Sequence, residues 1–198
     1  SNRLKSNVIA TGYDGRLTSP DLHQALCEGL KDSGAKVINI GMGPTPMTYF
    51  AHYHLEADAV IMVTGSHNPS EYNGFKMVLN KHSFYAEDIQ SLQKLIDQNN
   101  LKLTEGEIIN KDIKKEYINR LLQNINLNKK IKIAWDIGNG AMGAVIKEIT
   151  INLNNSDNIL INEEVDGNFP NHHPDPTVPK NMEQLVKVVK DKNCDIGL

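Results

Sequence analysis

Apolar positions in the first 64 residues fall into two kinds of run. Short runs of β-branched and other apolar residues, which predict strands, occupy residues 7–12, 37–40 and 57–63. Between them, residues 19–33 and 44–55 carry apolar side chains at spacings of three and four, as in amphipathic helices. The alternating order of strands and helices predicts an α/β fold.

The first helix has clear start and stop signals. Ser19 is expected to cap it, Pro20 suits its first position, and Gly34 ends it. Its buried face is expected to comprise Leu22, Ala25, Leu26, Gly29 and Leu30.

Residues 75–79 form a further apolar run that follows the third strand too closely for a crossover helix. We therefore expect an antiparallel strand and a mixed first sheet. Residues 86–97 and 111–125 show helical periodicity, with apolar positions at Ile89, Leu92, Leu95 and Ile96 in the first of these helices. The stretch 99–110 is interpreted as a connector, which places a domain boundary after Lys111 and predicts domains 1–111 and 112–198.

The second half repeats the α/β order. A strand at 131–137 leads into a glycine-rich turn and a helix, and a second strand follows at 159–161. Asn181 with Gln184 three residues later resembles a capping box at the start of another helix. Residues 194–198 begin a third strand.

The densest polar chemistry lies between the strands 57–63 and 75–79, in the segment Thr-Gly-Ser-His-Asn-Pro-Ser-Glu-Tyr-Asn-Gly-Phe-Lys at residues 64–76. Gly65 gives the backbone freedom beside Ser66, and the Asn-Pro and Asn-Gly pairs predict turns. The loop therefore holds Ser66 at the end of a strand. The nucleophile elbow of α/β-hydrolases needs Gly-x-Ser-x-Gly, and Thr64 and Asn68 break that pattern.

This segment resembles the active-site serine loop of the α-D-phosphohexomutases, most closely the phosphomannomutase/phosphoglucomutase branch. The family signature is Thr-Ala/Gly-Ser-His-Asn-Pro followed by Tyr-Asn-Gly-Phe-Lys, and residues 64–76 match it throughout. The resemblance implies that Ser66 carries a phosphoryl group. It further implies an isomerase that interconverts hexose 1-phosphate and hexose 6-phosphate through a hexose 1,6-bisphosphate intermediate.

A phosphoserine carries about −1.5 to −2 charges and needs cations nearby. Arg16, in a turn that matches the family's arginine turn, is expected to fork onto phosphate oxygens, and Lys76 matches the family's active-site lysine. His67 is expected to orient the phosphate or move a proton. The resemblance also implies Mg²⁺, with Ser66 as one ligand through its phosphate and with aspartates from a loop that is not among these 198 residues.

The resemblance covers the family's first domain and much of its second. It predicts a mixed-sheet phosphohexomutase domain 1 followed by an incomplete α/β domain 2 that stops before the metal loop. We therefore expect the chain alone to be inactive. The alternative is a truncated or split-gene non-catalytic module that needs a partner chain. The open last strand also predicts self-association or a partner.

Two further motifs allow other interpretations. Residues 138–143 satisfy G-x-G-x-x-G after a strand, and Asp157 follows where a ribose-binding acid would stand, which is the pattern of a nicotinamide-dependent oxidoreductase. The mutase family carries a similar Gly-Asn-Gly-Ala turn without a dinucleotide. His172, His173 and Asp175 resemble a metal cluster, but the prolines at 174 and 176 favour a rigid turn, and the family has a similar turn without a metal.

Composition narrows the class of protein. A net charge of −3 and a pI of about 6.1 disfavour nucleic-acid binding. No apolar run approaches the roughly 18 residues of a membrane span, and no apolar signal region stands at the N-terminus, so we expect a cytoplasmic protein without membrane partners. Cys27 and Cys194 lack metal or redox spacing and are expected to be buried free thiols.

Overall fold

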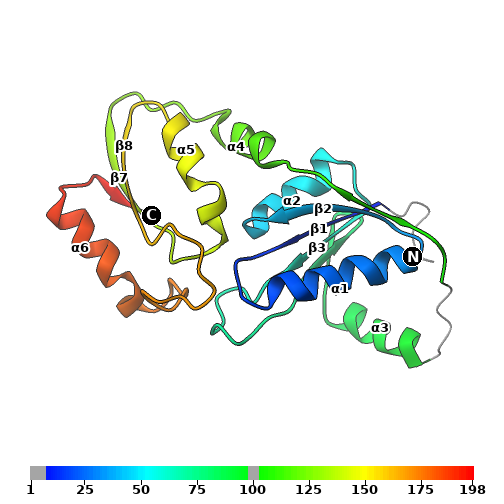
Figure 1. Cartoon of the computed structure of the whole chain (residues 1–198). Coiled ribbons are helices and arrows are strands. Elements are labelled where there is room, and N and C mark those ends of the chain that lie inside the picture. The colour runs from blue at the N-terminus through cyan, green and yellow to red at the C-terminus, as the bar shows by residue number, and fades with distance from the viewer. Residues whose placement is uncertain (1–7, 98–102) are drawn as a thin grey trace. The chain divides into compact units, whose positions relative to one another are not determined.

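The computed structural model describes residues 8–97 and 103–198, so the predicted start of the first strand at residue 7 and part of the connector lie outside the described residues. The chain divides into two compact units (Figure 1). The first contains residues up to Ile113 except two short segments. These segments, Gly15–Leu17 and Gly65–Asn73, group with Lys114–Leu198 in the second unit.

The first unit is built on a six-stranded sheet in the order β5-β4-β3-β1-β2-β6. Its strands are β1 (Val8–Tyr13), β2 (Lys36–Met42), β3 (Ala59–Val63), β4 (Phe75–Leu79), β5 (His82–Phe84) and β6 (Glu107–Asn110). The pairs among β1, β2, β3 and β6 are parallel, whereas β4 pairs antiparallel with β3 and with β5. This confirms the mixed sheet predicted from the short link before residue 75.

Two helices pack on the centre of this sheet. They are α1 (Ser19–Asp32) and α2 (Thr45–His54), and both contact β1. The connection from β1 to β2 runs one way across the sheet and that from β2 to β3 runs back, so right-handed crossovers place the helices on opposite faces. All five residues of β3 are buried, as expected of a strand covered on both sides.

The helix α1 corrects two predictions. Ser19 is the first helical residue and not the cap, and its hydroxyl donates to the Asp14 carboxylate at 2.6 Å. The fully buried positions are Ser19, His23 and Cys27, whereas three residues of the predicted face are exposed: Leu22, Ala25 and Gly29. The apolar pattern misplaced the face because two of its buried positions are polar.

His23 and Cys27 meet Thr11 of β1 in the interior. The ring Nε2 of His23 lies 3.0 Å from the Thr11 hydroxyl, which lies 3.3 Å from the Cys27 sulfur. Burial lowers the pKa of His23 and raises the pKa of the Cys27 thiol. The prediction of a buried free thiol is confirmed for Cys27, while Cys194 is only half-buried.

The region before the second unit differs from its prediction in two ways. The presumed connector ends in the strand β6, which Gly106 allows to approach closely, since a Cβ there would lie 2.2 Å from the Ala35 carbonyl oxygen. The helix α3 (Glu87–Asp97) forms as predicted but buries none of its residues. Its apolar face is therefore exposed.

The second unit contains a parallel three-stranded sheet in the order β8-β7-β9. Its strands are β7 (Ile131–Asp136), β8 (Ser156–Ile161) and β9 (Ile196–Gly197), and its helices are α4 (Lys114–Leu122), α5 (Ile146–Asn152) and α6 (Glu183–Asp191). Two 3₁₀ turns precede α5 and α6, η1 (Ala141–Ala144) and η2 (Pro179–Met182). Ile133, Ala134, Ile146 and Leu185 form part of its buried interior.

The capping box predicted for α6 is wrong. Met182 stands at the N-cap, and the Asn181 side chain donates to the carbonyl oxygen of Asp175 at 2.8 Å. Gln184 accepts a hydrogen bond from Asn162. The two polar side chains thus bind loop partners and not the helix end. Within the described ranges, no helix combines the length and apolar character that crossing a bilayer requires.

Candidate functional site

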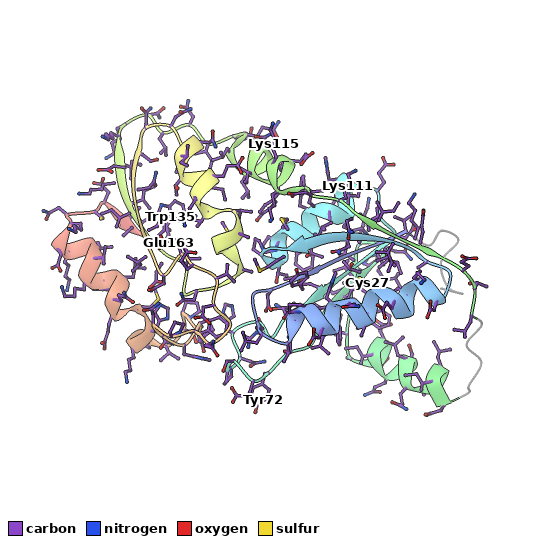
Figure 2. The ribbon with its side chains drawn as sticks, in the orientation of Figure 1. Cys27, Tyr72, Lys111, Lys115, Trp135 and Glu163 are labelled. Atoms are coloured by element: carbon purple, nitrogen blue, oxygen red, sulfur yellow. The ribbon has the colours of Figure 1, made fainter. Side chains whose placement is uncertain are left out.

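The loop that carries Ser66 leaves the sheet between β3 and β4. Its neck is closed by a backbone hydrogen bond from Thr64 to Gly74 at 2.9 Å. Beyond the buried Gly65, every residue from Ser66 to Tyr72 is exposed. Tyr72, labelled in Figure 2, is 57% exposed. The loop therefore presents its polar side chains outward.

The backbone of Ser66 is left-handed, with φ at +55°. This conformation is uncommon for a residue other than glycine and is often found where function requires it. Two internal hydrogen bonds shape the loop around it, from the Asn68 amide to the Gly65 carbonyl at 3.0 Å and from the Tyr72 amide to the Pro69 carbonyl at 3.1 Å. The result is a compact loop with the Ser66 hydroxyl on an exposed residue.

Arg16 lies under this loop and is only 2% exposed. Its Nη1 donates to the carbonyl oxygens of Pro69 at 2.6 Å and Tyr72 at 3.0 Å. Its Nη2 donates to the carbonyl oxygens of Ser66 at 3.0 Å and Asn68 at 2.8 Å. In this structure the terminal nitrogens thus contact loop backbone, and the predicted fork of Arg16 onto phosphate oxygens stays a prediction.

Arg16 is itself held by a turn of the second unit. The ring of Phe169 lies 5.3 Å from the guanidinium carbon, within the range of a cation–π contact. Gly167 packs against the turn that carries Arg16, because a Cβ at Gly167 would lie 2.7 Å from the Leu17 nitrogen. No local sequence pattern predicts these contacts, since the two segments are distant along the chain.

His67 joins the loop to the turn that contains Pro174. Its Nδ1 lies 2.7 Å from the Pro174 carbonyl oxygen. A carbonyl oxygen only accepts, so Nδ1 donates, and in the neutral ring Nε2 remains able to accept a proton. The predicted proton-moving role of His67 is chemically available from this tautomer and stays a prediction.

Lys76 belongs to the first unit, on β4, where it pairs with Met62 of β3 in the antiparallel register. Lys76 is half-buried. The structure therefore places three of the four predicted site residues, Ser66, His67 and Arg16, in the second unit and Lys76 in the first. A role for Lys76 beside the phosphate stays a prediction.

The glycine-rich turn at 138–143 uses its backbone amides internally. The amide of Gly138 donates to the Asp136 carboxylate at 3.0 Å, that of Asn139 to the Asn162 carbonyl at 2.9 Å, and that of Gly140 to the Ile137 carbonyl at 2.9 Å. A pyrophosphate-binding turn needs such amides directed at the ligand. This turn therefore lacks the defining feature of a dinucleotide site at these three amides.

Asp136, at the end of β7, is a functional-looking residue that sequence reasoning missed. Its Oδ2 lies 2.9 Å from Nε2 of His172, and its Oδ1 accepts from Asn162 at 2.9 Å. The other nitrogen of His172 faces the carbonyl oxygen of His173 at 3.0 Å. The sequence signal that could have identified Asp136 is its position between a strand and a glycine-rich turn. The pair fixes the His172 turn against β7.

The segment from Asp175 to Thr177 forms a turn that is held by its own hydrogen bonds. The hydroxyl and the amide of Thr177 donate to Asp175 and hold the pKa of its carboxyl below the usual value. Across the described residues, no three histidine, cysteine, aspartate or glutamate side chains are grouped so that they could hold a metal ion.

Comparisons with known proteins agree with this architecture. The family model for phosphoglucomutase/phosphomannomutase, alpha/beta/alpha domain I, matches residues 1–102, and that for domain II matches residues 115–198. A phosphomannomutase/phosphoglucomutase of Pseudomonas putida is 42% identical over 190 residues, which is 96% of this chain and 41% of that protein. A phosphoglucomutase of Neisseria meningitidis is 42% identical over 192 residues, 96% of this chain and 42% of that protein.

Among solved structures, a phosphoglucomutase/phosphomannomutase family protein from Burkholderia thailandensis superposes with a TM-score of 0.92 at 35% identity, over 99% of this chain and 44% of its own. The chain thus spans about two fifths of the length of the curated relatives it matches. The resemblance read from the serine loop is confirmed by these matches over both units. This chain belongs to the phosphoglucomutase/phosphomannomutase family.

Proposed function

We propose that the chain forms the phosphoserine-bearing part of a phosphomannomutase/phosphoglucomutase-type phosphotransferase, with Ser66 as the phosphoryl carrier. The observation that carries this proposal is the exposed, left-handed Ser66 on a loop whose backbone is bound from beneath by a buried arginine. Phosphoryl transfer depends mainly on positioning and charge stabilisation, and a fixed loop supplies the positioning. The division into domains 1–111 and 112–198 remains part of this proposal.

The proposed reaction has two balanced transfers. In the first, the bond between phosphorus and Oγ of phosphorylated Ser66 breaks, a bond from phosphorus to a hydroxyl oxygen of a hexose monophosphate forms, and the hydroxyl proton passes to a base. In the second, the bond between the other phosphorus and its sugar oxygen breaks, a bond from that phosphorus to Oγ of Ser66 forms, and the released sugar oxygen takes up the proton. The net change moves a phosphate between positions 1 and 6 of the sugar. No external oxidant or reductant is needed.

His67 and Lys76 complete the proposed site. His67 donates from Nδ1 to the Pro174 carbonyl, which leaves Nε2 of the neutral ring as an acceptor for a proton or, when protonated, as a donor to a phosphate oxygen. Lys76 would supply a compact positive charge to the transferring group. Arg16 adds positive charge beneath the loop.

Magnesium is the metal that the family resemblance implies, with a phosphate oxygen of phosphorylated Ser66 as one ligand. The described residues do not fit a magnesium site by themselves, because no metal-ligating group of three or more acidic, histidine or cysteine side chains is present among them. A single phosphate oxygen falls short of the near-octahedral ligation that Mg²⁺ demands.

The 198 residues match only 41% of the Pseudomonas putida relative. We propose that they carry the phosphoserine half of the chemistry and do not complete turnover by themselves. Mannose 1-phosphate supplied to the purified chain with Mg²⁺ and a hexose 1,6-bisphosphate primer should give no turnover above a Ser66→Ala blank.

Self-association of the chain also stays a prediction, and a monomer in sedimentation would contradict it.

A chimera tests the proposal directly. The matched region of the Pseudomonas putida relative is replaced by this chain, and conversion of mannose 1-phosphate is measured. We expect turnover that Ser66→Ala abolishes and that Ser70→Ala retains, since Ser70 is an exposed serine of the same loop. A chimera that folds, as judged by circular dichroism, but shows no Ser66-dependent turnover would instead support the non-catalytic module.

A further inference from the structure

The two terminal nitrogens of the Arg16 guanidinium are fully engaged by the loop. These two nitrogens carry four N–H groups, and the structure shows four bonds from them to the carbonyl oxygens of Ser66, Asn68, Pro69 and Tyr72. The loop carbonyls therefore converge on one planar cation. A phosphate on Ser66 would have to displace one of these bonds to reach a terminal nitrogen.

The shape of this contact needs arginine. The guanidinium presents its donors in a rigid planar fork, whereas the lysine ammonium offers three donors from a single point. Two nitrogens on the fork each serve two carbonyls, so the fork spans the loop from Ser66 to Tyr72. A lysine would keep the positive charge at this position but could not span the same carbonyls.

Burial ties the loop conformation to Arg16. The residue is 2% exposed, and a buried charge requires hydrogen-bond partners. The loop carbonyls supply these partners in the observed fold, in which Ser66 has a φ of +55°. The left-handed backbone of Ser66 and the four bonds to the terminal nitrogens of Arg16 thus belong to the same loop conformation.

We infer that Arg16 is a positioning residue, which holds Ser66 in its left-handed conformation and thereby sets the direction of the Ser66 side chain, and that its terminal nitrogens do not bind the transferred phosphate. The loop contacts carry this inference by themselves. It rests on the proposed function only where the direction of Ser66 is given a catalytic meaning. Arg16 contributes charge to the site through the loop and not by direct contact.

The first test is nuclear magnetic resonance of the purified chain carrying Arg16→Lys. We expect the amides of Asn68 and Tyr72, which are bonded inside the loop, to exchange at least about tenfold faster, the equivalent of one lost hydrogen bond. The Cα shift of Ser66 should leave its left-handed value, while amides of β3 and β7 keep their exchange rates. Arg120→Lys, the same substitution on an exposed residue of α4, should change none of these.

A rescue experiment guards against a trivial loss of fold. In Arg16→Gly, millimolar guanidinium should restore the Asn68 and Tyr72 protection, and ammonium at equal ionic strength should not. If neither variant folds, the wild-type chain still gives an answer. Its Arg16 Nη–H signals should exchange slowly and stay unshifted in saturating inorganic phosphate, and a shift there would overturn the inference.

The activity readout uses the chimera. Arg16→Lys should lower kcat with little change in KM for the hexose phosphate, because binding survives and the Ser66 direction does not. Retained kcat with an unchanged loop would show that the positive charge alone suffices, and lost kcat with unchanged loop exchange would show that the guanidinium contacts the transferred group directly; either result would overturn the inference. If the wild-type chimera has no turnover, the proposed function fails while the resonance measurements still decide the role of Arg16.

Discussion

Two turns of the second unit share a left-handed φ but direct their polar groups differently. Ser66 in the serine loop has φ at +55°, and Asn139 in the glycine-rich turn has φ at +56°. Both follow a glycine, and both occupy a conformation that few residues other than glycine adopt. Ser66 is exposed, whereas Asn139 is 5% exposed.

The difference lies in where their polar groups are directed. The Asn139 side chain donates to the Glu164 carbonyl at 2.9 Å and accepts from Asn171 at 2.8 Å. At Ser66, the carbonyl oxygen is bound by Arg16 while the side chain belongs to the exposed surface. Glycine content does not separate the buried turn at Asn139 from the exposed loop at Ser66. The partners of the backbone and side-chain polar atoms do.

The largest expected effect is the loss of stability on truncating Asn139, compared with the same truncation of Ser66. Asn139→Ala should lower the free energy of unfolding of the second unit by about 2–4 kcal/mol, since it strands buried hydrogen-bond partners and places a Cβ-bearing residue without a compensating amide at positive φ. Ser66→Ala should cost less than about 1 kcal/mol because its side chain lies on an exposed residue. Urea unfolding followed by fluorescence of Trp135, the single tryptophan, measures both.

Asn139→Gly is the control that separates the two causes. Glycine accepts the left-handed backbone but makes no side-chain hydrogen bonds, so its cost should be smaller than that of alanine by the backbone contribution. Equal costs for Asn139→Ala and Ser66→Ala would break the comparison between the two turns.

The next effect concerns the hydrogen-bonded pair of Asp136 and His172, which fixes the His172 turn. His172→Phe leaves the Asp136 carboxylate, whose side chain is 8% exposed, without its Oδ2 partner, and should cost about 2 kcal/mol. The exposed pair Lys187–Asp191 on α6 is the matched control, and Lys187→Met should cost less than about 0.5 kcal/mol. Comparable losses in urea unfolding would show that burial does not decide the value of these pairs.

A smaller effect is the response to acid. Burial lowers the pKa of His23, so the folded state binds its proton less readily than the unfolded state. Stability should therefore fall as pH drops below the ordinary histidine value of about 6.5, by at most about 1.4 kcal/mol per pH unit for one group. The pKa of His52 is lowered by burial as well, so His23→Gln should remove only part of this dependence.

His67→Gln is the control for that titration, because His67 is an exposed loop residue. The variant should keep the full acid dependence of the first unit in thermal melts between pH 7.5 and pH 5. Loss of that dependence in His67→Gln would tie the serine loop to the acid response and blur the contrast between exposed and buried sites.

The last prediction is the absence of NADH binding. Titration of the chain with NADH in a calorimeter should show no binding, because the amides of Gly138, Asn139 and Gly140 already donate within the protein. Measurable binding that Gly140→Ala abolishes would return the glycine-rich turn to the dinucleotide-binding class and contradict its structural use.

Local sequence signals predicted the order of elements and the identity of the serine loop. The runs at 57–63 and 75–79 gave the strands on either side of Ser66, and the short link gave their antiparallel pairing. These features depend on neighbours in the chain. The loop signature, with its fixed order of polar residues, also gave the family.

The remaining features depend on contacts between distant residues. The buried face of α1 includes His23, whose ring nitrogen forms a hydrogen bond with Thr11 of β1. Because this buried residue is polar, the apolar pattern misplaced the buried face. The strand β6 joins the sheet because Gly106 fits against Ala35. The hydrogen bonds of Arg16 reach residues 50 or more positions away along the chain, and no local sequence pattern predicts them.

The most direct measurement locates the phosphoryl group in the active chimera. The protein is quenched during turnover of mannose 1-phosphate with a hexose 1,6-bisphosphate primer and mapped by peptide mass spectrometry. We expect one phosphoryl group on Ser66, absent in Ser66→Ala and present in Ser70→Ala. A phosphoryl group on Ser70, or turnover that continues without phosphorylated Ser66, would contradict this expectation.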